Sequence, residues 1–149
     1  IYRAVTCVFW FDTSGVQWAA TGPESASNNI TFSPNGGALA IRNADGTAWI
    51  YDLRQAESPI RTFSKANNNS EASSFYDFCF NLSGDTLFTG TNKIIAWDTV
   101  SGVEKEVFQY PSEETVRCSS VTIANPNATD QLLCAGFWDG GLFFCPIKQ

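Results

Sequence analysis

Residues 30–52 read ITFSPNGGALAIRNADGTAWIYD, and this stretch decides the fold because its two landmarks recur along the chain. The landmarks are an aromatic residue before a Ser-Pro-Asn-Gly turn and an apolar-aromatic-Asp ending. Both recur in residues 78–98, FCFNLSGDTLFTGTNKIIAWD, and more loosely in residues 121–146, VTIANPNATDQLLCAGFWDGGLFFCP. With Asp12, which ends CVFWFD, the closing positions are 12, 52, 98 and 146, so that the spacings are 40, 46 and 48 residues.

The repeated stretches predict short antiparallel β-strands. The second copy contains FCF, TLFTG and KIIAW, which are β-branched and aromatic runs separated by turn residues. Two Asp-Gly dipeptides, Asp45-Gly46 and Asp139-Gly140, stand between such runs and are the strongest short hairpin signal, because both turn residues need positive φ. No run with the period of a helix competes with this interpretation.

A period of about 40 to 48 residues with several strands per unit is typical of a WD-type β-propeller blade, a four-stranded antiparallel sheet. The chain resembles the WD-repeat family over nearly its whole length. The resemblance is carried by the FSPNG and LSG turns, the two Asp-Gly turns and the closing pairs Tyr51-Asp52 and Trp97-Asp98. The resemblance implies an all-β partial propeller.

Two features mark the chain as a divergent member of that family. Trp138-Asp139 stands at the Asp-Gly turn of its repeat, and the closing position of that repeat holds Cys145-Pro146. The chain has no His, so that the buried His-Asp-Ser/Thr-Trp network typical of the family is not expected to form.

The expected organisation is one partial propeller. Residues 1–12 are the last strand of a preceding blade, and residues 13–52, 53–98 and 99–149 are three blades. Closed propellers have roughly four to eight blades, and open sheet edges promote aggregation. We therefore expect further blades, either from a longer form of this chain, which has no Met and starts in mid-pattern, or from a partner chain.

Two insertions separate the repeats. Residues 64–74 are polar with three consecutive Asn, which predicts a surface loop, and EKEVFQYPSEET, residues 104–115, is interpreted as an acidic linker. If the family topology holds, both join the outer strand of one blade to the inner strand of the next. They are either plain connectors or partner-binding loops.

Charge and hydropathy disfavour two classes of partner. The net charge is −6 and Lys and Arg are scattered, so that no basic stripe is present to neutralise phosphates and direct nucleic-acid binding is not expected. Aromatic residues beside the turns are interpreted as sheet packing rather than as a base-stacking platform. No apolar run approaches the roughly 18 to 20 residues that span a bilayer.

The five Cys residues are separated by 72, 39, 16 and 11 residues, so that no close pair of the zinc type occurs. All five are predicted on strands. If Asp139-Gly140 is a two-residue turn, Cys134 and Cys145 are directly opposed across the hairpin. We expect reduced packing residues there, with a redox-switchable disulfide as the alternative.

Four Asn-x-Ser/Thr patterns, at Asn29, Asn68, Asn81 and Asn127, match the glycosylation signal of secreted proteins. Asn29 and Asn81 also belong to the turn and strand pattern of the repeats. The odd number of Cys and the WD resemblance favour an intracellular location, cytoplasmic or nuclear.

Catalytic signals are weak. Without His there is no His-based triad, imidazole base or His metal ligand, and neither a cofactor nor a metal site is expected. A carboxylate pair of a propeller hydrolase remains an alternative. However, the aspartates at positions 12, 45, 52, 98 and 139 all fall at strand ends or turns, where Asp accepts bonds from local backbone donors.

The sequence therefore predicts a non-enzymatic protein-interaction scaffold, a subunit of a multiprotein complex. The alternative is a substrate receptor of a cullin-RING ubiquitin ligase. IRNADGTAWIYDLR, residues 41–54, resembles the short box through which such receptors dock to the ligase adaptor. The predicted partner-binding residues are Tyr51, Asp52 and Arg54, with Arg54 as the contact residue because its guanidinium reaches beyond the strand end.

Overall fold

The structure is a computed structural model that describes residues 7–12, 15–21, 27–43, 47–54, 58–63, 77–90, 93–111, 116–124 and 130–147. Within these ranges every regular element is a β-strand. The strands are β1 (Cys7–Asp12), β2 (Gly15–Thr21), β3 (Ser27–Phe32), β4 (Ala38–Asn43), β5 (Ala48–Asp52), β6 (Arg61–Phe63), β7 (Asp77–Phe80), β8 (Thr86–Gly90), β9 (Lys93–Asp98), β10 (Glu104–Gln109), β11 (Cys118–Ala124), β12 (Gln131–Phe137) and β13 (Leu142–Ile147).

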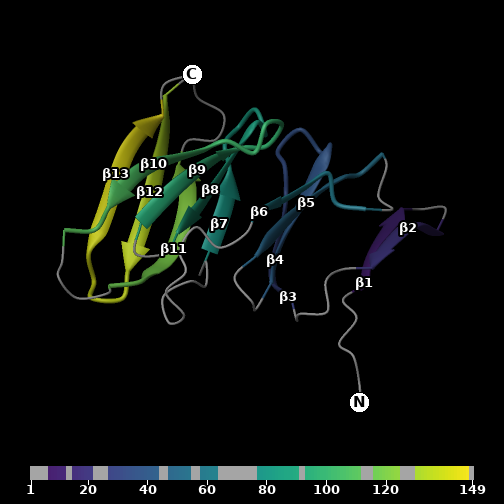
Figure 1. The fold of residues 1–149 in the computed structure, drawn as a ribbon, viewed down its shortest axis with the longest axis horizontal. Coiled ribbons are helices and arrows are strands. Elements are labelled where there is room, and N and C mark those ends of the chain that lie inside the picture. The colour runs from purple at the N-terminus through teal and green to yellow at the C-terminus, as the bar shows by residue number, and fades with distance from the viewer. Residues whose placement is uncertain are drawn as a thin grey trace, which may run out of the picture.

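Antiparallel pairing groups these strands into sheets. Two sheets have four strands, in the orders β3-β4-β5-β6 and β10-β9-β8-β7, a third has the order β11-β12-β13, and β1 pairs with β2. The sheets follow one another across the molecule, from the purple β1–β2 pair to the yellow strands near the C-terminus (Figure 1). The predicted class, all-β with four-stranded antiparallel sheets, is confirmed.

The sheets are offset by one strand from the expected units. The units 13–52, 53–98 and 99–149 each begin with a strand that pairs with the preceding unit: β2 with β1, β6 with β5 and β10 with β9. The two four-stranded sheets instead span residues 27–63 and 77–109. Each closing Asp therefore stands at the turn into a fourth strand, and the division of the chain into domains stays a prediction.

The two turns that identify the repeats are built alike. In the first, Gly36 has a φ of 70° and donates its N–H to the Ser33 carbonyl at 2.9 Å. In the second, Gly84 has a φ of 76° and donates to the Asn81 carbonyl at 3.1 Å. Glycine adopts this left-handed backbone without steric cost, which explains its place in both turns.

Two apolar clusters hold the sheets face to face. The first joins the two four-stranded sheets and contains Ala40, Ala48, Ile50, Phe63, Phe78, Phe80, Leu87, Ile95 and Trp97. The second lies on the other face of β7–β10 and joins it to β11–β13 through buried Phe88, Ile94, Cys118, Val121, Leu133, Ala135 and Phe137. Burying a large side chain of this kind stabilises a fold by about 1.5 to 3 kcal/mol, and alternation along each strand supplies both faces.

The hairpin between β12 and β13 has a longer turn than expected. Gly140 donates its N–H to the Phe137 carbonyl at 3.0 Å, Phe137 donates to the Gly141 carbonyl at 2.9 Å, and the φ of Gly140 is 88°. Residues 138–140 thus form a three-residue loop with a left-handed glycine. Trp138 stands in this loop, which confirms that its Trp-Asp pair does not close a repeat.

The extra loop residue shifts the register by one and overturns the expected cysteine pairing. Cys134 lies opposite Phe144, and Cys145 lies opposite Leu133. Because successive strand residues point to opposite faces, the two thiols lie on opposite faces of the sheet. Both are free, and a disulfide between them is incompatible with this register. The prediction that all five Cys lie on strands is confirmed.

The connections between repeats differ from those predicted from the sequence, because part of one predicted linker is a strand. Residues 104–109, taken for a linker, form β10, the fourth strand of its sheet, because Glu104 pairs with Trp97 and Gln109 pairs with Lys93. Its exposed charged residues Glu104, Lys105 and Glu106 suit an edge strand, whose outer side stays in water. The loop predicted for residues 64–74 and the turn at Asp45-Gly46 lie outside the described residues.

One half of the polar network typical of the family is present in spite of the missing His. The indole Nε1–H of Trp97 donates to Thr89 Oγ1 at 2.8 Å, and both side chains are buried. The Trp97 ring also packs on Phe63 of the neighbouring sheet, with ring centroids 4.9 Å apart. Trp97 therefore ties two strands of its own sheet together and anchors the next sheet.

Replacement of Trp97 by Phe is expected to lower the free energy of unfolding by about 1 kcal/mol, because Thr89 loses its buried donor while the aromatic contact largely remains. Urea unfolding of the full-length protein measures this change. The double variant with Thr89→Val removes both hydrogen-bonding groups and is expected to recover part of the loss. A double variant less stable than the sum of the two single changes would contradict this account.

Candidate functional site

The predicted partner-binding residues lie at one end of the two four-stranded sheets. β3 ends at Phe32 and β5 ends at Asp52, and both strands run in the same direction because each is antiparallel to β4. The amide nitrogen of Asn35, in the first turn of this sheet, donates to the Ser83 carbonyl in the next sheet at 3.1 Å. The turns of the two sheets therefore lie side by side at this end.

A groove of about 280 Å³ lies between these turns. Both sheets contribute to its walls. The first sheet supplies Asn35, Asp52, Arg54 and Ile60, and the second supplies Asp85, Thr99 and Val100. Two of the three residues predicted from the sequence thus belong to one groove.

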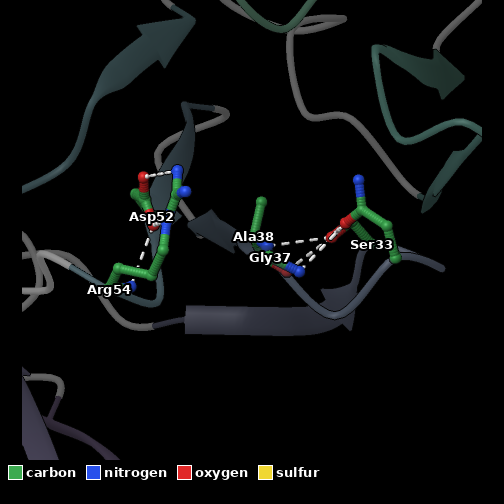
Figure 2. Close-up of polar contacts among 6 residues, drawn as sticks. Ser33, Gly37, Ala38, Asp52 and Arg54 are labelled. Carbon is green, nitrogen blue, oxygen red and sulfur yellow. Dashed lines mark hydrogen bonds and ion pairs between the residues drawn. The ribbon is translucent and has the colours of Figure 1, made fainter.

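Asp52 and Arg54 form a closed bidentate pair on the first wall (Figure 2). The Arg54 Nε–H donates to Asp52 Oδ1 at 2.9 Å, and Nη2 donates to Oδ2 at 2.7 Å. The backbone N–H of Arg54 also donates to Oδ1 at 2.9 Å. The side chain of Arg54 is 83% exposed, so that a partner can reach it although the carboxylate fixes its direction.

These bonds lower the pKa of Asp52 to about 2, chiefly through the side-chain hydrogen bonds of Arg54. Since the ordinary pKa of Asp is about 3.9, the pair contributes stability above about pH 4, and this contribution is lost as the pH falls towards 2. The pair is exposed to solvent, so that the effect on stability is small.

Carboxyl resonances followed by NMR are expected to show that Asp52 titrates near pH 2 in the full-length protein. Arg54→Ala removes the main cause of the low pKa and is expected to return the midpoint towards the ordinary value of about 3.9. Arg61→Ala, at a guanidinium that bonds to carbonyls instead, is the matched control and should leave the midpoint unchanged. An Asp52 midpoint insensitive to Arg54→Ala would contradict the pairing.

Tyr51, the third predicted contact residue, does not reach the groove. Its side chain is fully buried and packs in a cluster with Leu39 and Ile41 on the far face of the first sheet. The cause is strand alternation, because neighbouring residues of β5 point to opposite faces. In this fold Tyr51 is a core residue, whereas Asp52 and Arg54 line the groove.

Asp85 is the acidic group on the opposite wall. Its Oδ1 accepts hydrogen bonds from the Asn81 amide at 2.7 Å and from the Thr86 hydroxyl at 2.9 Å. The Asn81 bond is the main reason that the pKa of Asp85 is lowered. The hydroxyl of Thr99 donates to the Asp85 backbone carbonyl at 3.0 Å, which holds this turn against the next one.

The other closing and turn aspartates serve their own turns, as predicted. Asp98 Oδ1 accepts the backbone N–H groups of Val100 at 3.0 Å and Ser101 at 2.6 Å. Asp139 accepts the N–H of Gly141 at 2.9 Å and the hydroxyl of Tyr110 at 2.5 Å. The prediction is confirmed for these aspartates and for Asp52. Asp45 and the side chain of Asp12 lie outside the described residues.

Hydrogen bonds between and within the sheets hold the walls of the groove in place. The Arg61 guanidinium of β6 donates to the Val100 carbonyl of the next sheet through both Nε, at 2.7 Å, and Nη2. Within the first turn, Asn35 Oδ1 accepts the Ser33 hydroxyl at 2.7 Å and the Gly37 N–H at 2.9 Å. The groove is therefore framed by turns that are tied to one another.

Sequence reasoning missed Asp85, Ile60 and Val100. Ile60 lies in an irregular segment and carried no signal. A signal for Val100 was present, because it follows Asp98 at the same distance as Arg54 follows Asp52. Aligning the repeats at these closing positions would have paired the two residues on facing walls.

Two of the four glycosylation patterns, at Asn29 and Asn81, lie within the described residues, and both amides make hydrogen bonds to other side chains. Nδ2 of Asn29 donates to Asp77 at 2.9 Å. Asn81 is 9% exposed, and its Nδ2 donates to Ser83 and Asp85 at 2.9 and 2.7 Å. The amide nitrogen to which a glycan would attach is therefore hydrogen-bonded in both patterns. Asn68 and Asn127 lie outside the described residues.

In the described ranges no group of three or more His, Cys, Asp or Glu side chains is placed to hold a metal ion. Nor does that part of the chain contain a helix of the length and hydropathy needed to cross a bilayer.

Comparison with known proteins finds relatives among WD-repeat proteins, and no family model matches the chain. The guanine nucleotide-binding protein subunit beta of Arabidopsis thaliana is 26% identical over 124 residues, which cover 81% of this chain and 32% of that protein. WD repeat-containing protein 70 of Xenopus laevis is 28% identical over 104 residues, which cover 64% of this chain and 16% of that protein. The chain thus spans a third or less of the length of these relatives.

Among solved structures, the Dos1 propeller matches with a TM-score of 0.71 over 97% of this chain and 37% of that one, at 13% identity. This likeness concerns the fold alone. The repeat landmarks, the four-stranded sheets and the relatives agree with one another. The chain is therefore similar to WD-repeat proteins and has a propeller fold.

Proposed function

We propose that the chain is a non-enzymatic scaffold that binds other proteins within a multiprotein complex. The groove at the junction of the two four-stranded sheets carries this proposal. It combines the exposed guanidinium of Arg54 with Ile60 and Val100, which are 43% and 72% exposed. Arginine and exposed apolar side chains on a rigid support are typical of protein interfaces.

Two observations support a binding role over hydrolysis. The carboxylates of Asp52, Asp98 and Asp139 are each committed to neighbouring donors. A glycosidase needs two carboxylates that face each other across an open substrate site, with one of them holding a raised pKa. Asp52, Asp85 and Asp98 all have lowered pKa values, which suits bound charges better than a general acid.

The test is to purify the full-length protein at native level and to determine the intact mass of what travels with it. A stoichiometric protein partner is the expected result, and its identity names the process. A full-length chain that stays a lone monomer under these conditions, or that turns over a substrate, would contradict the scaffold proposal. The same mass also tells whether further blades come from this chain or from a partner.

A second candidate is the receptor of a cullin-RING ubiquitin ligase, and the position of Arg54 favours it. Arg54 stands beyond the end of β5 on the rim of the groove, and Asp52 holds its guanidinium in one direction. A planar guanidinium held in this way can bind acceptors on a docking partner.

If this candidate is right, Arg54→Ala abolishes capture of the purified ligase adaptor by the full-length protein. We expect at least a tenfold loss, the size of an interface hot spot of about 1.4 kcal/mol or more. Lys105→Ala, at an exposed cation on β10, is the matched control and should retain capture. If the wild-type protein does not bind the adaptor, the receptor function is excluded.

We also propose an intracellular location. Within the described residues Cys79, Cys118, Cys134 and Cys145 are free thiols, and reduced cysteines are typical of the cytoplasm and nucleus. The buried amide of Asn81 supports this view, since that pattern is not available for glycosylation.

A further inference from the structure

We propose that the groove between the two sheets receives a lysine or arginine side chain from the protein partner. This inference rests on the proposed scaffold function and specifies the chemistry of its contact. A volume of about 280 Å³ lies below the roughly 300 to 1,000 Å³ of small-molecule sites and suits a single side chain.

The charges that line the groove favour a cation. Asp52 and Arg54 neutralise each other through their bidentate pair, which leaves Asp85 as the unbalanced charge of the lining. Among the described residues no ion pair joins Asp85 to a Lys or Arg, and its side-chain hydrogen bonds come from Asn81, Thr86 and Ser83. A carboxylate accepts about four hydrogen bonds, so that capacity for a ligand remains.

Asp98, in the same sheet as Asp85, adds to the negative charge near this wall of the groove. The negative charge of Asp98 opposes the ionisation of Asp85, which shows that the two carboxylates repel each other. The charge of Arg61 partly offsets that of Asp98, while its guanidinium donates to the carbonyls of Ile60 and Val100. A cation held at Asp85 relieves the repulsion, since an opposite charge favours the ionised form of both carboxylates.

The rim of the groove suits the stem of such a side chain. Ile60 and Val100 both line the groove and are 43% and 72% exposed. Lys and Arg lay their methylene stems along apolar surface while the charged head stays in a polar site. An aliphatic rim above a carboxylate matches both halves of these side chains.

The test uses two variants of opposite charge at one exposed position. Val100 makes its hydrogen bonds through the backbone, with its N–H donating to Asp98 and its carbonyl accepting from Arg61. Because the side chain takes no part in these bonds, we expect Val100→Lys and Val100→Glu to leave the turn intact. Affinity of the full-length protein for its co-purified partner is measured at low and high salt. Val103, 66% exposed and outside the groove lining, supplies control variants with the same two charges.

If a basic side chain enters the groove, Val100→Lys weakens binding about twofold to fivefold and Val100→Glu strengthens it by a similar factor. Both effects shrink in high salt, and the Val103 variants change affinity less. If Val100→Lys strengthens binding and Val100→Glu weakens it, an acidic partner group faces Arg54 and the inference is wrong. The inference is also wrong if both variants lose the same affinity or if neither changes it. If no protein partner binds the wild-type chain, the scaffold proposal itself fails.

Discussion

Replacing Asp77 with alanine is expected to lower the free energy of unfolding by about 2 to 4 kcal/mol, because its carboxylate joins three sheets. Oδ1 accepts the Asn29 amide of β3 at 2.9 Å and the N–H of Phe78 at 2.9 Å. Oδ2 accepts the hydroxyl of Ser120 and the N–H of Val121, both from β11 and both at 3.0 Å. Removing the carboxylate takes the acceptor away from four donors, and bonds to a charged acceptor are among the strongest in proteins.

Urea unfolding of the full-length protein measures this loss. Asp130→Ala, at an exposed carboxylate, is the matched control and should change stability by less than about 0.5 kcal/mol. A double-mutant cycle between Asp77→Ala and Ser120→Ala should give a coupling of about 0.5 to 1.5 kcal/mol. A cycle with no coupling, or an Asp77→Ala protein as stable as the control, would show that the carboxylate does not join the sheets.

Gly90→Ala is expected to destabilise the protein by about 1 to 3 kcal/mol through overpacking. A Cβ at Gly90, the last residue of β8, would lie 2.4 Å from Sγ of Cys118 and 2.9 Å from its Cβ. Cys118 is fully buried on β11, so that its side chain has nowhere to move. The two sheets must separate locally to admit the methyl group.

The matched control is Gly136→Ala on β12, where a Cβ would meet no atom closer than 3.4 Å. That change should leave stability the same or raise it slightly, since alanine restricts the unfolded chain. Cys118→Ala in the Gly90→Ala background removes the 2.4 Å contact but keeps the 2.9 Å one, so a partial rescue is expected. Thermal unfolding midpoints of these proteins are the measurement, and equal midpoints for Gly90→Ala and Gly136→Ala would contradict the close approach.

The fold could be predicted because its signals are local. Alternation of apolar residues, the glycines that follow Ser33 and Asn81, and the closing aspartates act within a few residues of one another, and they recur at each repeat. The strands and the four-stranded sheets followed from them. The grouping of strands was offset because the repeat landmarks end at the third strand, while hydrogen bonding continues through β6 and β10.

The last hairpin shows that an error of one residue in the predicted turn length moves a side chain to the other face of the sheet. Asp139-Gly140 is a hairpin signal for turns of two or three residues, and the signal does not distinguish them. The structure has three loop residues, so that Cys134 lies opposite Phe144 rather than Cys145. One residue of turn length decides which side of the sheet a thiol occupies.

The candidate site was predicted in part. Asp52 and Arg54 follow a strand end and lie on the groove, whereas Tyr51 belongs to the core. Asp85 comes from the neighbouring sheet, and no local pattern indicates that it lines the same groove as Arg54. For Val100 the only signal was its distance from Asp98, which equals that of Arg54 from Asp52.

Local pattern was thus enough for the strands, the turns and the family resemblance, because these depend on backbone preferences and alternation between neighbours. Tertiary structure alone decided the groove, the junction at Asp77 and the contact between Gly90 and Cys118. Each of these joins residues from different sheets that are 28 to 48 positions apart along the chain. Their meeting depends on how whole sheets pack face to face, which no short stretch of sequence encodes.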